Sequence, residues 1–325
     1  MQNTPYISLA DIQTAPMPPG YKTATGLMPH TLRNDLMFRI VFEANPDALK
    51  ALLCSLLRLN PEDITDLEIA NPIRLGDRIG EKTYVLDINI LLNKQNKIHL
   101  ELQVLSQEFW TERSLCYLCR NFDKLNTGDD YDKIKPLIQI DILDFELYKD
   151  SKEFYSIYHL ANDTTHRIYS SKFALHVLEL NKEEYATEED KAYQLNYWAR
   201  LFKATTWGEI KMLAQEQNKL QSTVETIYRM NADDYVRAEL QAREDNLRLQ
   251  RSIDNKIQKQ VALLAKQADK IAEQSDKIAE QSGKIAEQSD KIAEQSDKIA
   301  DLSVQLSARE AYIAELEAKL NQQTK

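Results

Sequence analysis

Two carboxylates, Asp87 and Glu101, stand inside two neighbouring apolar segments of the sequence, KTYVLDINILL and KIHLELQVL. In a β-strand, successive side chains point to opposite faces, so residues whose numbers have the same parity share a face. The even positions of both segments are apolar, whereas the odd positions carry the polar set Asp87, Asn89, His99, Glu101 and Gln103. A hairpin whose turn has an odd number of residues places Asp87 opposite Glu101 or Gln103 on one face.

Carboxylates paired in this way point to metal-assisted chemistry on a phosphate. Two carboxylates side by side repel each other unless a cation or a proton lies between them. Mg²⁺ is commonly bound by one or two carboxylates, with water and a substrate phosphate completing its shell. The alternative interpretation is the solvated outer face of an antiparallel hairpin, where polar side chains are expected.

The composition of the chain limits the classes of protein to which it can belong. The chain has 325 residues, with 41 basic and 51 acidic residues and a formal net charge of −10. That balance argues against binding nucleic acid by bulk electrostatics but leaves room for a local basic patch. No apolar run is long enough to span a membrane, and no signal peptide pattern is present. Three cysteines are typical of a reducing compartment, so we expect a cytoplasmic protein.

The pattern of helix and strand signals divides the chain into four parts. We expect a mobile leader, a mixed α/β domain, a helical extension and a heptad-repeat segment, over 1–26, 27–180, 181–250 and 251–325. A first helix over 34–59 should break at Asn45–Pro46, because the residue before proline avoids helical geometry. Further strands are expected over 63–75, 135–145, 152–162 and 166–180, with helices over 111–125 and from Glu183 onward.

The last part repeats the heptad DKIAEQS with small variations. Isoleucine recurs every seven residues, at Ile271, Ile278, Ile285, Ile292 and Ile299. A strict heptad is typical of a left-handed coiled coil, although each repeat offers one strong apolar residue where a stable seam has two. Pairs such as Glu273 and Lys277 stabilise a helix by themselves. Two interpretations stay open, a weakly self-associating coiled coil and a solvated single helix.

The order of elements resembles the PD-(D/E)XK nuclease superfamily, whose core is αβββαβ. More narrowly, the chain is similar to the Rpn family of recombination-promoting nucleases and transposases over about 30–250. The resemblance rests on RNDLMFRIVF, VLDINI, HLELQV, FWTERSLCYLCRNF, GDDYDKIKPLIQIDILDF and NADDYVRAELQAREDNLR. It implies an α/β, restriction-endonuclease-like core, followed here by a helical region and a C-terminal heptad-repeat coiled coil.

The resemblance also implies roles for individual residues. Asp87 and Glu101 match the acids that hold Mg²⁺, and Asp35 matches a first-helix acid that completes the metal shell. The alternative for Asp35 is a helix N-terminal acid favoured by the helix dipole. Gln103 completes the catalytic set of Asp87, Glu101 and Gln103, at the place where the superfamily has lysine. An amide orients water but carries no charge, so we expect a slow or tightly regulated enzyme. Leu86 replaces the proline of the superfamily motif, which does no chemistry.

A basic helix follows the hairpin. Arg113, Tyr117, Arg120 and Lys124 are three or four residues apart, so they share one helix face and are predicted to contact DNA phosphates. A solvated helix face is the alternative. The sequence therefore favours a Mg²⁺-dependent DNA endonuclease that forms homo-oligomers through its coiled coil. Two other classes stay open, namely an inactive relative that binds DNA or protein, and a structural coiled-coil protein.

Overall fold

The computed structural model of the chain describes residues 8–73, 87–106, 108–122 and 130–323. The chain divides into two compact units, Met1–Arg251 and Ser252–Lys325. The first unit contains every β-strand of the described residues, and the second is helical.

The first unit is built on a mixed sheet of six strands in the order β1-β2-β3-β4-β6-β5. The strands are β1 (Leu67–Ile69), β2 (Ile88–Leu92), β3 (Asn96–Gln103), β4 (Leu137–Leu143), β5 (Tyr155–Tyr158) and β6 (Phe173–Glu179). β3, β4 and β6 are parallel, whereas β1, β2 and β5 pair antiparallel to their neighbours. β3 therefore lies inside the sheet, between the hairpin partner β2 and the parallel strand β4.

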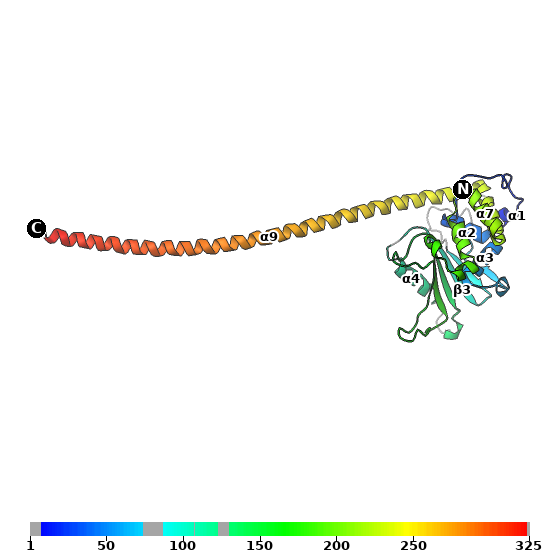
Figure 1. The fold of residues 1–325 in the computed structure, drawn as a ribbon, viewed down its shortest axis with the longest axis horizontal. Coiled ribbons are helices and arrows are strands. Elements are labelled where there is room, and N and C mark those ends of the chain that lie inside the picture. Colours follow the sequence, from blue (N-terminus) through cyan, green and yellow to red (C-terminus); the bar gives the residue numbers. More distant parts are fainter. Residues whose placement is uncertain (1–7, 74–86, 107, 123–129, 324–325) are drawn as a thin grey trace, which may run out of the picture. The chain divides into compact units, whose positions relative to one another are not determined.

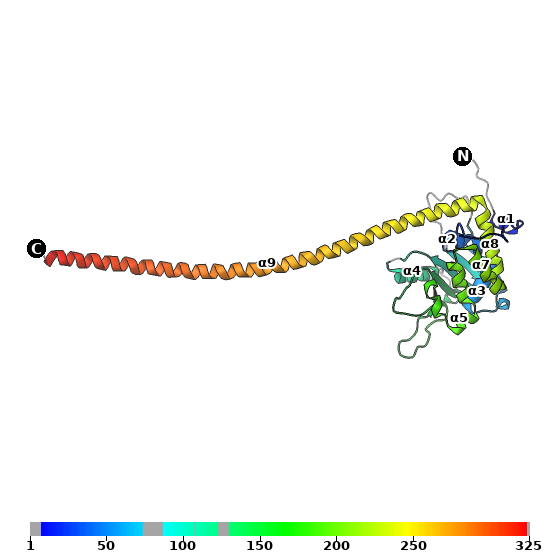
Figure 2. The ribbon, with the colours of Figure 1, turned by 45° about the horizontal axis from the view of Figure 1, so that its top comes forward.

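Helices cover both faces of this sheet. They are α1 (Leu9–Thr14), α2 (Asp35–Ala44), α3 (Pro46–Leu57), α4 (Trp110–Phe122), α5 (Glu188–Ala192), α6 (Leu195–Lys203), α7 (Trp207–Glu216), α8 (Gln221–Ala232) and α9 (Asp234–Gln323). In two views of the fold, α4 lies on one side of the sheet and α2 and α3 lie on the other (Figure 1, Figure 2). The order α2–α3, β1, β2, β3, α4, β4 confirms the predicted αβββαβ arrangement.

The even-numbered residues of the hairpin form the main core, as alternation predicted. The buried set is Ile88, Ile90, Leu92, Ile98, Leu100 and Leu102, which belong to one cluster with α2, α3 and α6. Each fully buried aliphatic side chain contributes about 1.5–3 kcal/mol, so this face fixes the register of β2 and β3. The odd-numbered face is thereby turned toward α4.

The first helix breaks where Asn45 and Pro46 predicted. Asn45 ends α2 and also begins α3, and its Oδ1 accepts a hydrogen bond from Ala48 N at 3.0 Å. Pro46 occupies the first position of α3, where its missing N–H costs no helical hydrogen bond.

Part of the predicted leader, residues 8–26, packs against the first unit. Leu9 of α1 is buried in the main core, and the Tyr21 ring packs edge-on against Tyr228 with centroids 5.2 Å apart. The Tyr228 hydroxyl donates a hydrogen bond to Pro19 O at 2.8 Å. The apolar residues of this segment are spaced without helical or strand periodicity, because each packs separately beside α8. The sequence pattern therefore gave no sign that the segment is packed.

Several strands are shorter than predicted. β1 is confined to Leu67–Ile69, because Pro61–Asp63 form a turn of 3₁₀ helix before it. Residues 74–75 of the predicted strand lie outside the described residues, as do residues 82–86 of the predicted hairpin. β5 and β6 lie within the two later strand segments, and the chain is mainly helical after Glu183, as predicted.

The second unit continues α9 as one uninterrupted helix over 252–323. The five repeat isoleucines are all 65–67 % exposed, and each Glu–Lys pair at spacing i,i+4 closes an ion pair of 2.6–2.7 Å. The helix is confirmed, whereas the coiled coil stays a prediction. None of the helices in the described part of the chain combines the length and the apolarity that crossing a membrane requires.

Candidate active site

The hairpin that carries the two carboxylates has the register that alternation predicted. β2 and β3 are antiparallel, with Asn89 opposite His99. Their turn, 93–95, has an odd number of residues, and its first two residues have positive φ angles of 51° and 58°. Continuing the register by one residue beyond β2 places Asp87 opposite Glu101. The two carboxylates therefore leave the same face of the sheet.

His99 of β3 lies between these carboxylates. Its Nδ1 is 2.8 Å from Asn89 Oδ1 and 3.5 Å from Asp87 Oδ2, and its Nε2 is 3.8 Å from Glu101 Oε2. When Nδ1 carries the ring proton, it donates to the Asn89 oxygen, and Nε2 faces Glu101. Within the described residues, Nε2 and Glu101 Oε2 are both buried without a hydrogen-bond partner. A cation between them would satisfy both atoms.

A third carboxylate, Asp141, is buried beside Glu101 on the next strand. The parallel pairing of β3 and β4 aligns Glu101 with Asp141. Ser114 Oγ of α4 donates to Asp141 Oδ2 at 2.7 Å, and Gln139 Nε2 donates to Oδ1 at 3.0 Å. Burial raises the pKa of Asp141 from 3.8 to about 6; the two hydrogen bonds lower it and the charge of Glu101 raises it. Asp141 is therefore held by neutral donors and titrates near neutral pH.

The backbone of Asp87 is held by Arg39, a fully buried arginine of α2. Arg39 Nη1 donates to the Asp87 carbonyl oxygen at 2.6 Å, and Asn71 Nδ2 donates to the same oxygen at 3.0 Å. Glu43, one helical turn further along, forms an ion pair of 2.7 Å with Arg39. These contacts fix the point at which the chain enters β2, and so they position Asp87.

Gln103 is on the same side of β3 as Glu101, because the two residues are two positions apart. Its Nε2 donates a hydrogen bond to the backbone oxygen of Leu105 at 2.8 Å. Among the described residues, no hydrogen bond joins its amide to Asp87 or Glu101. The amide is therefore held toward the end of its own strand.

Asp35 is in the first turn of α2, and its carboxylate forms a two-point ion pair with Arg243 of α9. Arg243 Nε lies 2.8 Å from Asp35 Oδ1, and Nη2 contacts Oδ2. Across the described residues, no three Asp, Glu, His or Cys side chains are arranged to hold one metal ion. The expected ligand set of Asp35, Asp87 and Glu101 is therefore not assembled, because Arg243 already neutralises Asp35.

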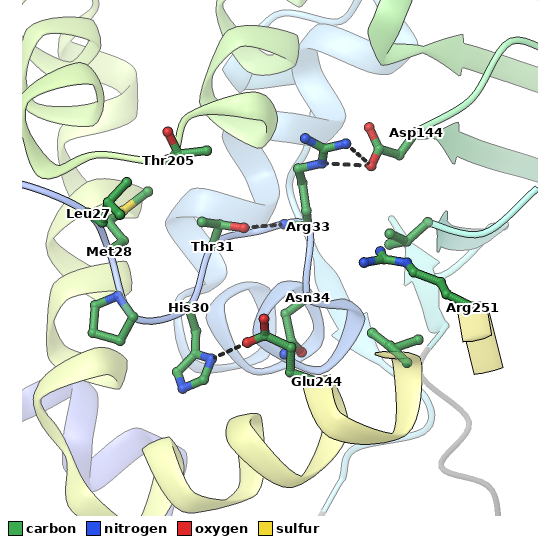
Figure 3. Close-up of a pocket in the computed structure, with 13 residues that line it drawn as sticks. Leu27, Met28, His30, Thr31, Arg33, Asn34, Asp144, Thr205, Glu244 and Arg251 are labelled. Atoms are coloured by element: carbon green, nitrogen blue, oxygen red, sulfur yellow. Dashed lines mark hydrogen bonds and ion pairs between the residues drawn. The ribbon is translucent and has the colours of Figure 1, made fainter. Parts of the chain in front are cut away.

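A cavity of about 590 Å³ adjoins the start of α2, beyond the ends of β3 and β4 (Figure 3). Arg33 Nη2 lies 2.5 Å from Asp144 Oδ2, and His30 Nδ1 lies 3.2 Å from Glu244 Oε2. Arg251 is a further cation in the lining. The cavity is thus lined by two acids, Asp144 and Glu244, and by two arginines, Arg33 and Arg251, so its charges balance. The His30–Glu244 contact joins α9 to the segment before α2.

α4 carries the residues that were predicted to bind DNA. The Arg113 guanidinium lies over the Tyr117 ring at 5.2 Å from its centroid, and the Tyr117 ring is centred 6.4 Å from that of His99. This stack brings Arg113 and Tyr117 beside the His99 cluster. Arg120 is exposed in the last turn of α4, and Lys124 lies outside the described residues.

A comparison with known protein families identifies the class of protein to which this chain belongs. A family model described as PD-(D/E)XK nuclease family transposase matches residues 32–260, or 229 of the 325 residues. The chain belongs to the PD-(D/E)XK nuclease transposase family. No curated protein and no solved structure matches it. The resemblance read from the sequence is thereby confirmed, and membership supports a nuclease-like function.

Four residues of this candidate site were not identified from the sequence. They are Arg39, Ser114, Gln139 and Asp141. A usable signal existed for two of them, because Gln139 and Asp141 are polar residues of equal parity in the otherwise apolar LIQIDIL. Arg39 had a weaker signal, an arginine enclosed by apolar residues with Glu43 four positions later. Ser114 had none, since serine is common on any helix surface.

Proposed function

We propose that this PD-(D/E)XK family member is a divalent-metal-dependent DNA endonuclease that hydrolyses phosphodiester bonds. The observation that carries the proposal is the placement of Asp87 and Glu101 on one face, around His99, with Glu101 Oε2 buried and unpartnered within the described residues. Two carboxylates so placed repel each other, so they do not serve the stability of the hairpin. They suit a site that receives a cation.

The donor set fits Mg²⁺, which prefers carboxylate oxygens and water. Asp87 and Glu101 would hold the ion. A bound ion of this kind polarises a phosphoryl oxygen and lowers the pKa of bound water. Asp35 would join the ligands only after exchanging its ion pair with Arg243 for the metal.

The protein's own groups prepare the site. Arg39 fixes the backbone of Asp87, and the imidazole of His99 contacts both carboxylates. The Gln103 amide, whose Nε2 donates to Leu105 O, would orient a water molecule with its remaining hydrogen-bonding groups but supplies no positive charge, so turnover is slow. On α4, the cations Arg113 and Arg120 contact DNA phosphates, and Tyr117 packs against Arg113. The same role is proposed for Lys124, which lies outside the described residues.

A second candidate function is a catalytically weak or inactive relative that binds DNA or a protein partner. The replacement of lysine by Gln103 favours it, as does the absence of an assembled three-ligand cluster among the described residues. Either candidate would act in the cytoplasm, and the two differ in whether a phosphodiester bond of DNA is cut.

The repeat helix of the second unit favours self-association whichever of the two candidate functions holds. Its five isoleucines recur every seven residues and are about two-thirds exposed in the single chain. A second copy of the helix would cover this column as a coiled-coil seam. Association through the tail would bring two active sites to two DNA strands or ends.

Nicking of supercoiled plasmid tests the function directly. The wild type should nick DNA with Mg²⁺ and not with a chelator, and Asp87→Ala should lower the rate by more than about a hundredfold, because one carboxylate holds Mg²⁺ poorly. Asp163→Ala, at an exposed loop position, is the matched control and should cut normally. Wild-type rates in Asp87→Ala would show that the metal site is wrong. A wild type that never cuts would establish the second candidate.

A further inference from the structure

A second polar groove, of about 540 Å³, adjoins the candidate active site on the same side of the sheet. Its cations are Lys97 at the start of β3, and Lys133 and Lys135 in the segment that leads into β4. Its neutral polar side chains are Asn71, Asn89 and Asn121. Among the described residues that line the groove, none is acidic, although the whole chain has a net charge of −10.

The lysines are placed by the fold and are not a run in the sequence. The backbone N–H of Lys97 donates to Pro136 O at 2.8 Å, which joins β3 to the segment that carries Lys133 and Lys135. Lys135 Nζ donates to Lys94 O, in the hairpin turn, at 3.1 Å. Asp132 precedes Lys133 in the sequence but does not line the groove. The groove is therefore basic because tertiary contacts collect its cations.

The groove is continuous with the catalytic carboxylates through Asn89. This residue lines the groove and also contacts the His99 ring between Asp87 and Glu101. Lys97, His99 and Glu101 follow one another at alternate positions of β3, so they lie along one face of a single strand. Asn121 belongs to the last turn of α4, the helix whose Tyr117 contacts His99.

We propose that this groove, lined by Lys97, Lys133 and Lys135, holds the sugar-phosphate backbone of the DNA substrate on one side of the cut. The inference rests on the proposed nuclease function and names the path that its substrate takes. Lysine ammonium groups bind phosphate oxygens, and asparagine amides donate to phosphate and sugar oxygens without reading the bases. The groove thus supplies affinity and register and no sequence preference.

The geometry of β3 also gives the distance from groove to cut. Four residues separate Lys97 from Glu101, and a strand rises about 3.3 Å per residue, so they are about 13 Å apart. For a DNA strand that runs along β3, two phosphates that are two nucleotides apart differ by about 7 Å along the axis and are also turned about the helix, so they lie about 13 Å apart. The phosphates bound in the groove should therefore lie about two nucleotides from the bond that is cut.

Salt-dependent DNA binding of the full-length protein tests the proposal. Affinity for a 30-base-pair duplex (a length of about 100 Å) is measured by fluorescence anisotropy in chelator, so that no cleavage is needed. Replacing Lys97, Lys133 and Lys135 together by Ala should weaken binding about tenfold or more. The slope of log K against log salt should fall by about 2.7, or about 0.9 for each phosphate that the variant no longer neutralises. Triple replacement by Arg should keep the slope.

The matched control removes the same charge elsewhere. Lys277, Lys284 and Lys291 on the repeat helix each pair with a glutamate four residues earlier, and replacing them by Ala should leave the slope unchanged. An unchanged slope in the groove variant, or an equal loss in the control, would overturn the groove assignment. Tryptophan fluorescence of each variant verifies that the first unit is folded, because all three tryptophans belong to it.

A second measurement separates this inference from the proposed function. On an oligonucleotide that the wild type cuts, uncharged methylphosphonates about two nucleotides from the cut should weaken binding by the wild type and leave binding by the groove variant unaffected. Equal weakening of both proteins would refute the groove. A duplex that is bound with the expected slope but never cut would refute the endonuclease and support the groove.

Discussion

Replacing Asp141 by Asn should make the first unit more stable at alkaline pH than at acid pH, relative to the wild type. Asp141 is fully buried between β3, β6 and α4, where Ser114 and Gln139 donate to its two oxygens. Asparagine is nearly isosteric and keeps one oxygen to accept from Gln139. The substitution therefore removes the titrating group while leaving the packing in place.

The magnitude follows from the pKa of Asp141, which burial raises from 3.8 to about 6. A raised pKa means that the folded state binds the proton more tightly than the unfolded chain does. The stabilisation from this group is thus fully present below pH 3.8 and is lost as the pH rises through about 6. The difference between the two pKa values corresponds to about 3 kcal/mol. The stability of Asp141→Asn minus that of the wild type should rise by about 2.4 kcal/mol between pH 4 and pH 8, because at pH 4 the unfolded chain is already partly ionised.

Urea unfolding monitored by tryptophan fluorescence measures this difference. The three tryptophans report on the first unit alone, so the repeat helix adds nothing to the signal. Chelator is included because a cation at Glu101 would change the charge beside Asp141. Titrating groups that do not interact with Asp141 contribute equally to both proteins and cancel, whereas Glu101 and His99 are coupled to it and do not. A stability difference that stays constant from pH 4 to pH 8 would refute the inference that ionisation of Asp141 destabilises the folded state.

Two further predictions concern the Gln103 amide and the repeat helix. Gln103→Lys supplies the positive charge that the superfamily motif carries, so plasmid nicking should be as fast as the wild type or faster; an abolished rate would show that the amide has another role. Deleting residues 252–325 should leave the first unit folded and lower the association state, because each repeat isoleucine covered by a partner contributes up to about 1.5–3 kcal/mol. Sedimentation of both proteins decides this, and monomers in both cases at about tens of micromolar would exclude the coiled coil.

Local pattern in the sequence was sufficient for the elements around the site. Alternation assigned the buried and polar faces of β2 and β3 and the odd-length turn, because side-chain direction in a strand depends only on parity. Asn45 and Pro46 marked the end of α2, because proline excludes helical geometry in the residue before it. The family motifs lie within these same elements, and so the family was recognisable from them.

Contacts between distant segments decided the rest. Asp35 is neutralised by Arg243, which is 208 residues away in the sequence, and no local pattern reports such a pair. Asp141 acquires its raised pKa only when α4, β3 and β6 enclose it, since burial is a property of the folded chain. The basic groove arises because a backbone hydrogen bond brings Lys97 beside the segment of Lys133. The sequence by itself thus determined which carboxylates share a face, whereas the tertiary structure decided which charges surround them, because charge and burial act through space and not along the chain.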